Sequence, residues 1–132
     1  MIIVADTNVL VRAAVLDDAA QAQLARNAMG GSDRVVVTLP ALCEFVWVLS
    51  KSYRLGSLEI PISIRQLIGA DNIETDLPAV EAGLAMLDAG GDFADGVIAF
   101  EGRRMGAETF VSFDRKAVGL LAAQGEAARL LA

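Results

Sequence analysis

The chain carries the apolar run Ile2-Ile3-Val4-Ala5 directly before Asp6. A short run without polar residues is typical of a buried strand. The β-branched run Val35-Val36-Val37-Thr38 predicts a second buried strand, and Thr109-Phe110-Val111-Ser112 predicts a third. Because segments with helical spacing separate these runs, we expect an α/β sandwich with a mostly parallel sheet.

Caps, glycines and prolines bound the helical segments. Gly30-Gly31 and Gly90-Gly91 end two of them, and Pro40 suits the first turn of another. The expected helices cover residues 7–16, 18–29, 40–51, 57–68, 76–90 and 93–105, with a last helix from Asp114. A weak strand is expected at residues 72–75, and another near the C-terminus. No repeat, low-complexity tract or linker divides the chain, so we expect one domain over residues 1–132.

The composition excludes several kinds of active site. The 132 residues include no histidine and a single cysteine, Cys43. Ser-His-Asp and Cys-His catalysis, Cys/His zinc sites and an intrachain disulfide are therefore excluded. If the chain is an enzyme, its working groups are mainly carboxylates.

The net charge of −6 is unfavourable for general nucleic-acid binding, because phosphate contacts need lysine and arginine. A nuclease is compatible with this charge only if much of it lies in one site and is neutralised there by cations. Apolar residues make up 55% of the chain, and its mean hydropathy is +0.49. Both values are high, which predicts apolar surface that meets a second subunit or a partner.

We do not expect a membrane protein. The longest apolar run, Leu39 to Leu49, is interrupted by Glu44 and is too short to span a bilayer. The N-terminus has neither the positively charged start nor the cleavage site of a signal peptide. The expected location is therefore cytoplasmic.

Four acidic residues are expected at one edge of the sheet. Asp6 follows the first strand, and Asp114 follows the strand that ends near Ser112. Asp95 lies in the first turn of a helix, and Glu44 lies one turn into the helix after the second strand. In open parallel sheets, sites form beyond the carboxyl ends of the strands. Clustered carboxylates repel unless they take up protons or bind metal, and oxygen ligands without His or Cys favour Mg²⁺ or Mn²⁺.

Each acidic residue also has a structural explanation. Asp6 and Asp114 could cap the helices that follow them. Asp92 and Asp95 stand at positions that could be the N-cap and N3 of one helix. For Asp92 we favour the capping role, and for Asp95 the functional one once the other three carboxylates are considered with it. Glu44 has apolar neighbours and would be costly to bury unpaired, so its alternative is a partly exposed position at the helix edge. The functional interpretation rests on the set of residues rather than on any single one.

Basic and aromatic residues give weaker signals. Arg115-Lys116 adjoins Asp114 and could hold a phosphate backbone. Trp47 is expected in the core rather than as a platform for a stacked base. The glycine pairs are expected in turns, because no phosphate-binding loop or dinucleotide fingerprint surrounds them.

Three segments resemble the VapC-type toxins, which are the PIN-domain ribonucleases of bacterial type II toxin–antitoxin pairs. The segments are Val4-Ala5-Asp6-Thr7-Asn8-Val9-Leu10-Val11-Arg12, Asp92-Phe93-Ala94-Asp95-Gly96-Val97-Ile98-Ala99 and Phe110-Val111-Ser112-Phe113-Asp114. Their order, their spacing and the helix that carries Glu44 all match, and the resemblance covers nearly the whole chain.

The resemblance implies a fold, an activity and a site. The fold is a PIN-like three-layer sandwich, in which a central, mostly parallel sheet of four to five strands has helices on both faces. The activity is Mg²⁺- or Mn²⁺-dependent endonucleolytic cleavage of RNA. The family's acidic ligands carry over to Asp6, Glu44, Asp95 and Asp114. Supporting positions are Thr7, Asn8, Asp92 and Ser112, and candidate RNA contacts are Arg12, Arg115 and Lys116.

Two positions depart from the family's pattern. Members commonly have threonine at the position of Ser112, and some have a further acidic residue where this chain has Arg115-Lys116. A fully ligated second metal ion is therefore not implied. One ion, held by Asp6 and Asp95 with help from Glu44 or Asp114, would lower the pKa of a bound water and offset charge on the scissile phosphate.

The resemblance also implies partners. VapC-type toxins are usually homodimers, and a cognate VapB-type antitoxin neutralises them by wrapping around the toxin. The antitoxin can direct a basic side chain toward the acidic pocket, and operator DNA is bound through the antitoxin. An acidic chain that is rich in apolar residues fits such a partner.

Two other classes remain as alternatives. The first is a PIN-like binding module that has lost turnover. The second is a phosphoryl-accepting α/β domain of the haloacid-dehalogenase or receiver type, because both place an aspartate after the first strand. The dehalogenase type needs a second acid where this chain has Asn8, and the receiver type needs an acidic pair where Ala5 and Thr7 flank Asp6. Both types also need a lysine after a late strand, whereas Lys116 lies in a helix past Asp114.

Overall fold

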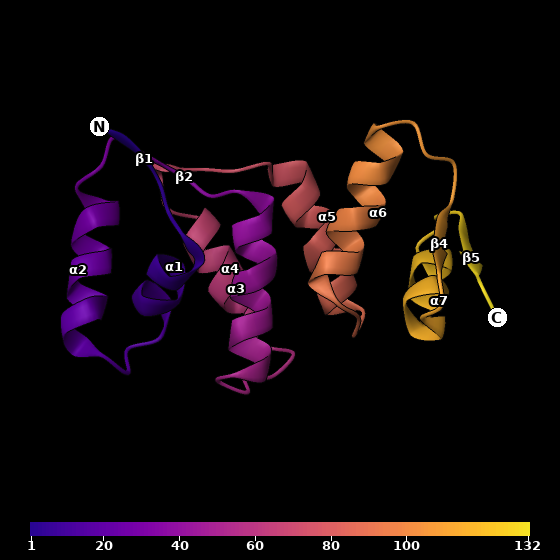
Figure 1. The fold of residues 1–132 in the computed structure, drawn as a ribbon, viewed down its shortest axis with the longest axis horizontal. Helices are drawn as coiled ribbons and strands as arrows, with labels where there is room; N and C mark the ends of the chain where they lie inside the picture. Colours follow the sequence, from indigo (N-terminus) through magenta and orange to yellow (C-terminus); the bar gives the residue numbers. More distant parts are fainter. The chain divides into compact units, whose positions relative to one another are not determined.

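Seven helices and five strands make up the computed structural model, which describes all 132 residues (Figure 1). The chain forms two compact units, Met1–Asp76 and Leu77–Ala132, and each is described by itself. Strands alternate with helices along the chain, and every strand pair is parallel. The α/β class expected from the sequence is therefore confirmed, and a single domain over residues 1–132 stays a prediction.

The first unit contains three strands and four helices. In chain order they are β1 (Ile2–Val4), α1 (Thr7–Ala14), α2 (Ala19–Gly30), β2 (Arg34–Val36), α3 (Leu39–Lys51), α4 (Glu59–Ile68) and β3 (Ile73–Glu74). The sheet has the order β1-β2-β3. Ile3 lies opposite Val35, and Val36 lies opposite Glu74. The strand patterns of the sequence thus correspond to real strands in this unit, including the weak one before residue 75.

The core of the first unit is built from the apolar faces of its helices and the central strand β2. Leu10, Val35, Phe45, Leu49 and Ile64 are fully buried there. Helix α1 packs against both α2 and α3. Burying each such side chain contributes roughly 1.5–3 kcal/mol relative to leaving it in water, so these contacts fix the positions of α1 and α3.

The strand β1 is less buried than its apolar sequence predicts. Ile2 and Val4 are exposed at 54% and 67%, while Ile3 between them is partly buried. Alternate residues of a strand face opposite sides, and only one side of β1 is partly covered. The expected second strand is also shorter at its end, because Thr38 is the N-cap of α3 and accepts a hydrogen bond from the Ala41 backbone N–H at 3.4 Å.

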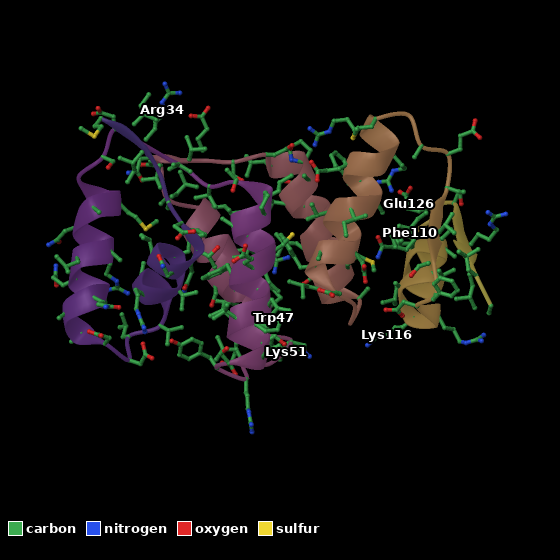
Figure 2. All side chains as sticks on the ribbon, viewed as in Figure 1. Arg34, Trp47, Lys51, Phe110, Lys116 and Glu126 are labelled. Atoms are coloured by element: carbon green, nitrogen blue, oxygen red, sulfur yellow. The ribbon has the colours of Figure 1, made fainter.

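The expected core position of Trp47 is wrong. Trp47 is 61% exposed and lies on α3 with Lys51, as Figure 2 shows. The buried face of α3 carries Leu42, Phe45 and Leu49 instead. Apolar residues occur around most of this helix, so their spacing alone did not identify the face that turns away from the core.

The second unit contains three helices and two strands. They are α5 (Leu77–Asp88), α6 (Phe93–Arg104), β4 (Phe110–Ser112), α7 (Arg115–Ala123) and β5 (Ala128–Leu130). The parallel pair β4-β5 places Phe110 opposite Ala128 and Ser112 opposite Leu130. The chain has five strands, and they are hydrogen-bonded as a group of three and a group of two. A single central sheet of four to five strands with helices on both faces therefore stays a prediction.

Glycines allow α5 and α6 to approach closely. A Cβ on Gly83 would meet the Phe93 ring at 2.5 Å, and a Cβ on Gly96 would overlap the backbone carbonyl oxygen of Ala82. Phe93 is fully buried by this packing. Because Gly96 follows Asp95 directly in the chain, the close approach holds the first turn of α6 in place.

The predicted helix ends agree closely with the observed ones. Helix α1 ends at Ala14 rather than at Leu16, and α6 ends at Arg104 rather than at Met105. Pro40 lies in the first turn of α3, as its missing N–H requires. None of the helices combines the length and the apolar character that are needed to cross a membrane.

Candidate functional site

Asp6 stands at the junction between β1 and α1. Its backbone is extended, and its side-chain Oδ1 accepts a hydrogen bond from the Thr7 N–H at 2.9 Å, so Asp6 is the N-cap of α1. The side chain is exposed, and Oδ2 has no hydrogen-bond partner. The capping explanation of Asp6 is therefore confirmed, and one oxygen stays available for another ligand.

Glu44 lies on the exposed side of α3, one turn after the cap. Its Oε2 accepts a hydrogen bond from Oγ1 of Thr7 at 3.3 Å. Thr7 is 9% exposed and is the only buried polar residue of the chain. The partly exposed position considered for Glu44 is thus the observed one, so no burial penalty argues for its function. A buried hydroxyl nevertheless orients its carboxylate.

One groove of the first unit collects several of the predicted residues. It has a volume of about 630 Å³ and is lined by Asp6, Thr7, Asn8, Val11, Arg12, Glu44, Val48, Ser52 and Tyr53. Five of these residues were expected from the sequence, namely Asp6, Thr7, Asn8, Arg12 and Glu44. They come from α1 and α3, whose packing is fixed by the core. The groove therefore joins carboxylates from distant parts of the sequence.

The second unit holds the other acidic candidates. Asp92 is the N-cap of α6, where its Oδ1 accepts from the Ala94 N–H at 3.4 Å. Asp114 is the N-cap of α7, where its Oδ1 accepts from the Ala117 N–H at 3.1 Å. Asp95 lies in the first turn of α6 and is partly buried. The capping roles considered for Asp92 and Asp114 are confirmed.

Asp95 is held in an environment that disfavours its charge. Burial raises the pKa of its carboxyl group above the ordinary value of 3.8, and the negative charges of Asp92 and Asp114 raise it further. The carboxylate of Asp95 therefore interacts with that of Asp92, which caps the same helix, and with that of Asp114, which caps α7. Such a group of like charges is relieved by a bound cation or by a proton.

The remaining predicted residues of the second unit lie at the end of β4 and the start of α7. The Oγ of Ser112 accepts a hydrogen bond from the Asp114 N–H at 2.9 Å, which shapes the turn that carries Asp114. Arg115 and Lys116 are exposed in the first turn of α7, and Figure 2 labels Lys116 there. Neither has an ion pair, so their expected role in RNA contact stays a prediction.

Two residues in or near the groove, Tyr53 and Asp17, had no signal in the sequence. Tyr53 donates a hydrogen bond from its hydroxyl to Oδ2 of Asp17 at 3.0 Å, and Arg12 donates to both residues. Tyr53 follows α3, and Asp17 lies in the turn between α1 and α2. Arg12 and Tyr53 are 41 residues apart in the chain, so no local spacing could have joined them.

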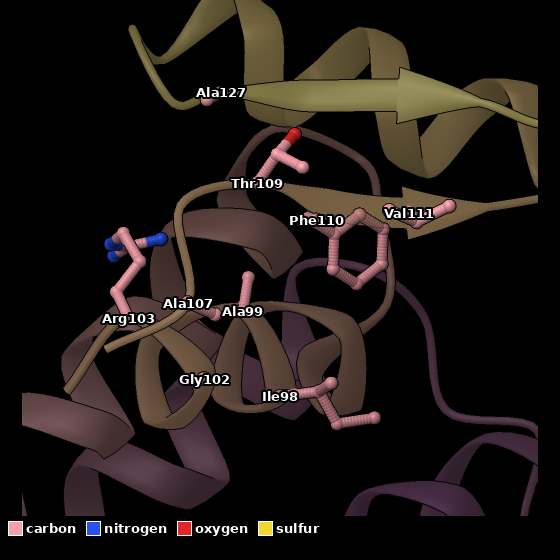
Figure 3. A pocket seen from close by; sticks show the side chains of 9 residues that line it. All are labelled: Ile98, Ala99, Gly102, Arg103, Ala107, Thr109, Phe110, Val111 and Ala127. Carbon is pink, nitrogen blue, oxygen red and sulfur yellow. The ribbon is translucent and has the colours of Figure 1, made fainter. Parts of the chain in front are cut away.

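A smaller cavity in the second unit is of a different kind. It has a volume of about 280 Å³ and is lined by Ile98, Ala99, Gly102, Arg103, Ala107, Thr109, Phe110, Val111 and Ala127 (Figure 3). Its one charged residue, Arg103, pairs with Glu126 at 3.0 Å. Without acidic residues in its lining, this cavity is not part of the predicted site.

The acidic residues fit a hard divalent cation in their chemistry. All of them offer oxygen ligands, and the chain has no histidine that could favour a softer metal. The raised pKa of Asp95 and the free Oδ2 of Asp6 show groups that a cation would stabilise. Neither unit by itself gathers three acidic side chains in an arrangement that could hold a metal ion.

Comparison with known proteins assigns the family. No curated protein matches the sequence of this chain. The family model described as the PIN domain matches residues 3–120, which include Asp6, Glu44, Asp95 and Asp114. The match spans most of both units and agrees with the α/β architecture of parallel strands and covering helices. The chain therefore belongs to the PIN domain family.

Proposed function

We propose that the chain is a divalent-cation-dependent endoribonuclease that hydrolyses phosphodiester bonds of RNA. PIN domains are generally metal-dependent nucleases, so membership in the family indicates nuclease activity in general. The observation that carries the finer proposal is the groove of the first unit, where Asp6 and Glu44 meet and Thr7 orients Glu44.

The proposed site combines four carboxylates, Asp6, Glu44, Asp95 and Asp114, around Mg²⁺ or Mn²⁺. When bound, such a cation activates water and offsets negative charge on a phosphodiester. The chain has no histidine, so the proton that water loses must pass to a carboxylate or to solvent. Burial and the acidic neighbours of Asp95 raise its pKa, so this carboxylate accepts a proton more readily than an ordinary aspartate.

The family match and the capping geometry support this set. All four residues lie within the matched range of residues 3–120. Asp6 and Asp114 each use Oδ1 to cap a helix, so the backbone fixes the position of each carboxylate. A net charge of −6 is also compatible with nucleic-acid chemistry when cations neutralise the acidic residues.

The decisive experiment compares Asp6→Asn and Asp95→Asn with wild type. Cleavage of a single-stranded RNA in Mg²⁺ or Mn²⁺ should fall in each variant by about 100-fold or more, because an amide is a poorer ligand for a hard cation. Asp71→Asn is the matched control, since Asp71 is exposed and lies outside the acidic set. Circular dichroism checks that each variant is folded. Substantial cleavage by both folded variants would reject the site.

The alternative to a nuclease is a catalytically silent PIN-like module, and metal binding distinguishes the two. A cation that binds only the native state raises the melting temperature by mass action. We expect Mn²⁺ to stabilise wild type and to stabilise Asp95→Asn much less. An equal shift in the two proteins, together with no cleavage, would favour the silent module. A phosphoryl-accepting domain is no longer supported, because the family match is to PIN domains.

We further propose that the nuclease is the toxin of a type II toxin–antitoxin pair and acts in the cytoplasm. The three segments that resemble VapC-type toxins support this role, and they imply a homodimer and a VapB-type antitoxin that alone contacts operator DNA. Exposed apolar residues such as Leu24 (69%) and Ile62 (54%) offer surface for protein contacts. Expression in a bacterial host should arrest growth, and Asp6→Asn should restore it. Light scattering tests for the homodimer.

A further inference from the structure

Arg12 is held by two side chains from other parts of the first unit. Its Nη1 donates to Oδ1 of Asp17 at 3.1 Å and to the hydroxyl oxygen of Tyr53 at 3.4 Å. Tyr53 in turn donates to Oδ2 of Asp17 at 3.0 Å, which closes a ring of three hydrogen bonds. The ring joins the last turn of α1, the turn before α2 and the bend after α3.

The ring uses only one nitrogen of the guanidinium group. An arginine has five N–H donors in a planar fork. Both hydrogen bonds of Arg12 start from Nη1, so Nε and both N–H groups of Nη2 have no partner. This unused edge is the one that binds two oxygens of a phosphate at once. The side chain is 34% exposed, so a ligand can reach it.

The groove around Arg12 suggests a ligand for the unused edge of its guanidinium group. Arg12 is the only basic residue in the lining that also contains Asp6 and Glu44. One groove therefore offers carboxylates for a cation and a guanidinium for an anion. A phosphodiester chain carries a negative charge at every nucleotide, so one phosphate can meet the cation while a neighbouring phosphate meets Arg12. The volume of about 630 Å³ is in the range of ligand sites, about 300–1,000 Å³.

The backbone has an uncommon conformation at Arg54, the residue after Tyr53. Arg54 has a φ of 54°, the one positive φ outside glycine in the chain. A non-glycine residue in the left-handed conformation costs about 1 kcal/mol, and such backbone strain is often found at ligand-binding and active sites. The Tyr53 hydroxyl lies within hydrogen-bond distance of both Asp17 and Arg12.

We propose that Arg12 binds a backbone phosphate of the RNA next to the one that is cleaved, and that Asp17 and Tyr53 are its positioning residues. The proposal rests on the ribonuclease function proposed above and adds a substrate contact to the same groove. Asp17 and Tyr53 fix the guanidinium through Nη1, so the Nε and Nη2 edge is ordered before the substrate arrives. Such preorganisation reduces the entropy lost on binding.

A purely structural ion pair is the explanation that must be excluded. The Arg12 and Asp17 side chains are 34% and 46% exposed, and pairs of this kind contribute about 0–1 kcal/mol to stability. Arg34 offers a matched control, because it forms a similar exposed pair with Glu74 at 3.0 Å and lies outside the groove. Arg12→Gln and Arg34→Gln remove the same charge and an ion pair of the same type.

The test measures binding of a fluorescent single-stranded RNA oligonucleotide in EDTA, so that cleavage does not interfere. Arg12→Gln should weaken binding by about tenfold, the loss expected for hydrogen bonds to a charged group. It should also lower the slope of log Kd against log salt by about 0.7, the value for one phosphate contact on a single strand. Arg34→Gln should change neither quantity beyond the general effect of one charge.

Two further variants test the positioning. Tyr53→Phe keeps the ring and removes the hydroxyl, so it should raise KM in Mg²⁺ by about threefold while kcat stays within about twofold. Arg12→Lys keeps the charge and loses the planar fork, so it should recover only part of the affinity. A salt slope and an affinity for Arg12→Gln equal to those of Arg34→Gln would overturn the proposal.

Failure of the ribonuclease function would look different. In that case wild type would not cleave RNA in Mg²⁺ or Mn²⁺, while the difference in salt slope between Arg12→Gln and Arg34→Gln would persist. Conversely, wild type could cleave normally while Arg12→Gln retains its KM and its salt slope, and then only the phosphate contact is wrong. A wild type that binds no RNA with or without Mg²⁺ overturns the contact as well.

Discussion

Thr7 donates a hydrogen bond from Oγ1 to Oε2 of Glu44 at 3.3 Å, across 37 residues of sequence. The donor is nearly buried in α1, and the acceptor is exposed on α3. Because α1 and α3 pack directly, the bond ties one carboxylate of the groove to the core rather than leaving it free to rotate. Thr7 is thus a positioning residue for Glu44.

Removing the Thr7 hydroxyl should lower the rate of RNA cleavage clearly while changing the free energy of unfolding only a little. Thr7→Val keeps the shape of the side chain and leaves Glu44 without its donor, so we expect RNA cleavage to fall by about 10-fold. Unfolding free energy should change by less than about 1.5 kcal/mol, because Glu44 can turn to water. Thr7→Ser should retain activity, and Thr109→Val serves as a control at an exposed threonine. Equal activity of Thr7→Val and wild type would contradict the positioning role.

The ionisation of Tyr53 can be followed alone, because it is the only tyrosine of the chain. Burial raises its pKa above the ordinary value of 10.0, the hydrogen bond to Asp17 and the charge of Asp17 raise it further, and Arg12 opposes them. Ultraviolet absorbance of the tyrosinate should therefore show a midpoint above 10.0. Asp17→Asn should lower the midpoint, and Arg12→Gln should raise it. An unchanged midpoint in Asp17→Asn would show that the ring of hydrogen bonds does not form in solution.

The raised pKa of Tyr53 also determines whether the free energy of unfolding rises or falls at alkaline pH. In the unfolded chain Tyr53 loses its proton near 10.0, while the folded protein keeps it to a higher pH. The folded state therefore binds more protons in this window, and unfolding free energy should fall as the pH rises from 10.0 to the raised pKa of Tyr53. Tyr53→Phe should lack this part of the decline in a urea titration at alkaline pH.

The raised pKa of Asp95 predicts how the free energy of unfolding differs between acidic and neutral pH. Its pKa is raised in the folded protein, so ionising it destabilises the fold as the pH rises from 3.8 through the raised value. Without metal, Asp95→Asn should be more stable than wild type at neutral pH, by less than about 1 kcal/mol because the group is partly exposed. The difference should vanish below pH 3.8, where Asp95 is protonated in both states. Urea unfolding in EDTA at the two pH values checks this, and a stabilisation that persists in acid would contradict it.

Packing of α5 on α6 makes a further prediction about the glycines. A Cβ on Gly96 would overlap the Ala82 carbonyl, so Gly96→Ala should destabilise the protein by about 1–3 kcal/mol. Gly119 is the matched control in α7, where a Cβ would meet nothing within 4 Å. Gly119→Ala should stabilise the protein by about 0.5–1 kcal/mol, because alanine favours the helix. Thermal unfolding of both variants measures the contrast, and equal effects would show that α5 and α6 do not pack this closely.

The sequence predicted those parts of the structure that are determined locally. Asp92 and Asp114 cap the helices that their positions indicated, because capping needs only the residue and the next turn. The apolar runs correspond to strands for the same reason, since β-branched residues favour an extended chain wherever they lie. Thr7 and Asn8, which follow Asp6 directly in the sequence, also line the groove with it, and their supporting role stays a prediction.

The features that the sequence did not predict depend on tertiary contacts. The exposure of Trp47 and of Val4 is decided by what packs against α3 and β1, and an apolar pattern alone does not contain this information. The association of Arg12 with Asp17 and Tyr53 is decided by how α1 approaches the end of α3. An arginine in a helix and a tyrosine after another helix are common, and only the fold makes them partners.

In Asp6 and Asp114, one carboxylate oxygen accepts a hydrogen bond from the helix that follows, and the other oxygen is unused. An asparagine in either place would still accept the backbone N–H, so a single base change from Asp to Asn removes the negative charge without loosening the helix. Under the proposed function, such a variant would lose a metal ligand and keep the fold that a protein partner recognises. Loss of cleavage and loss of partner binding would then require different substitutions.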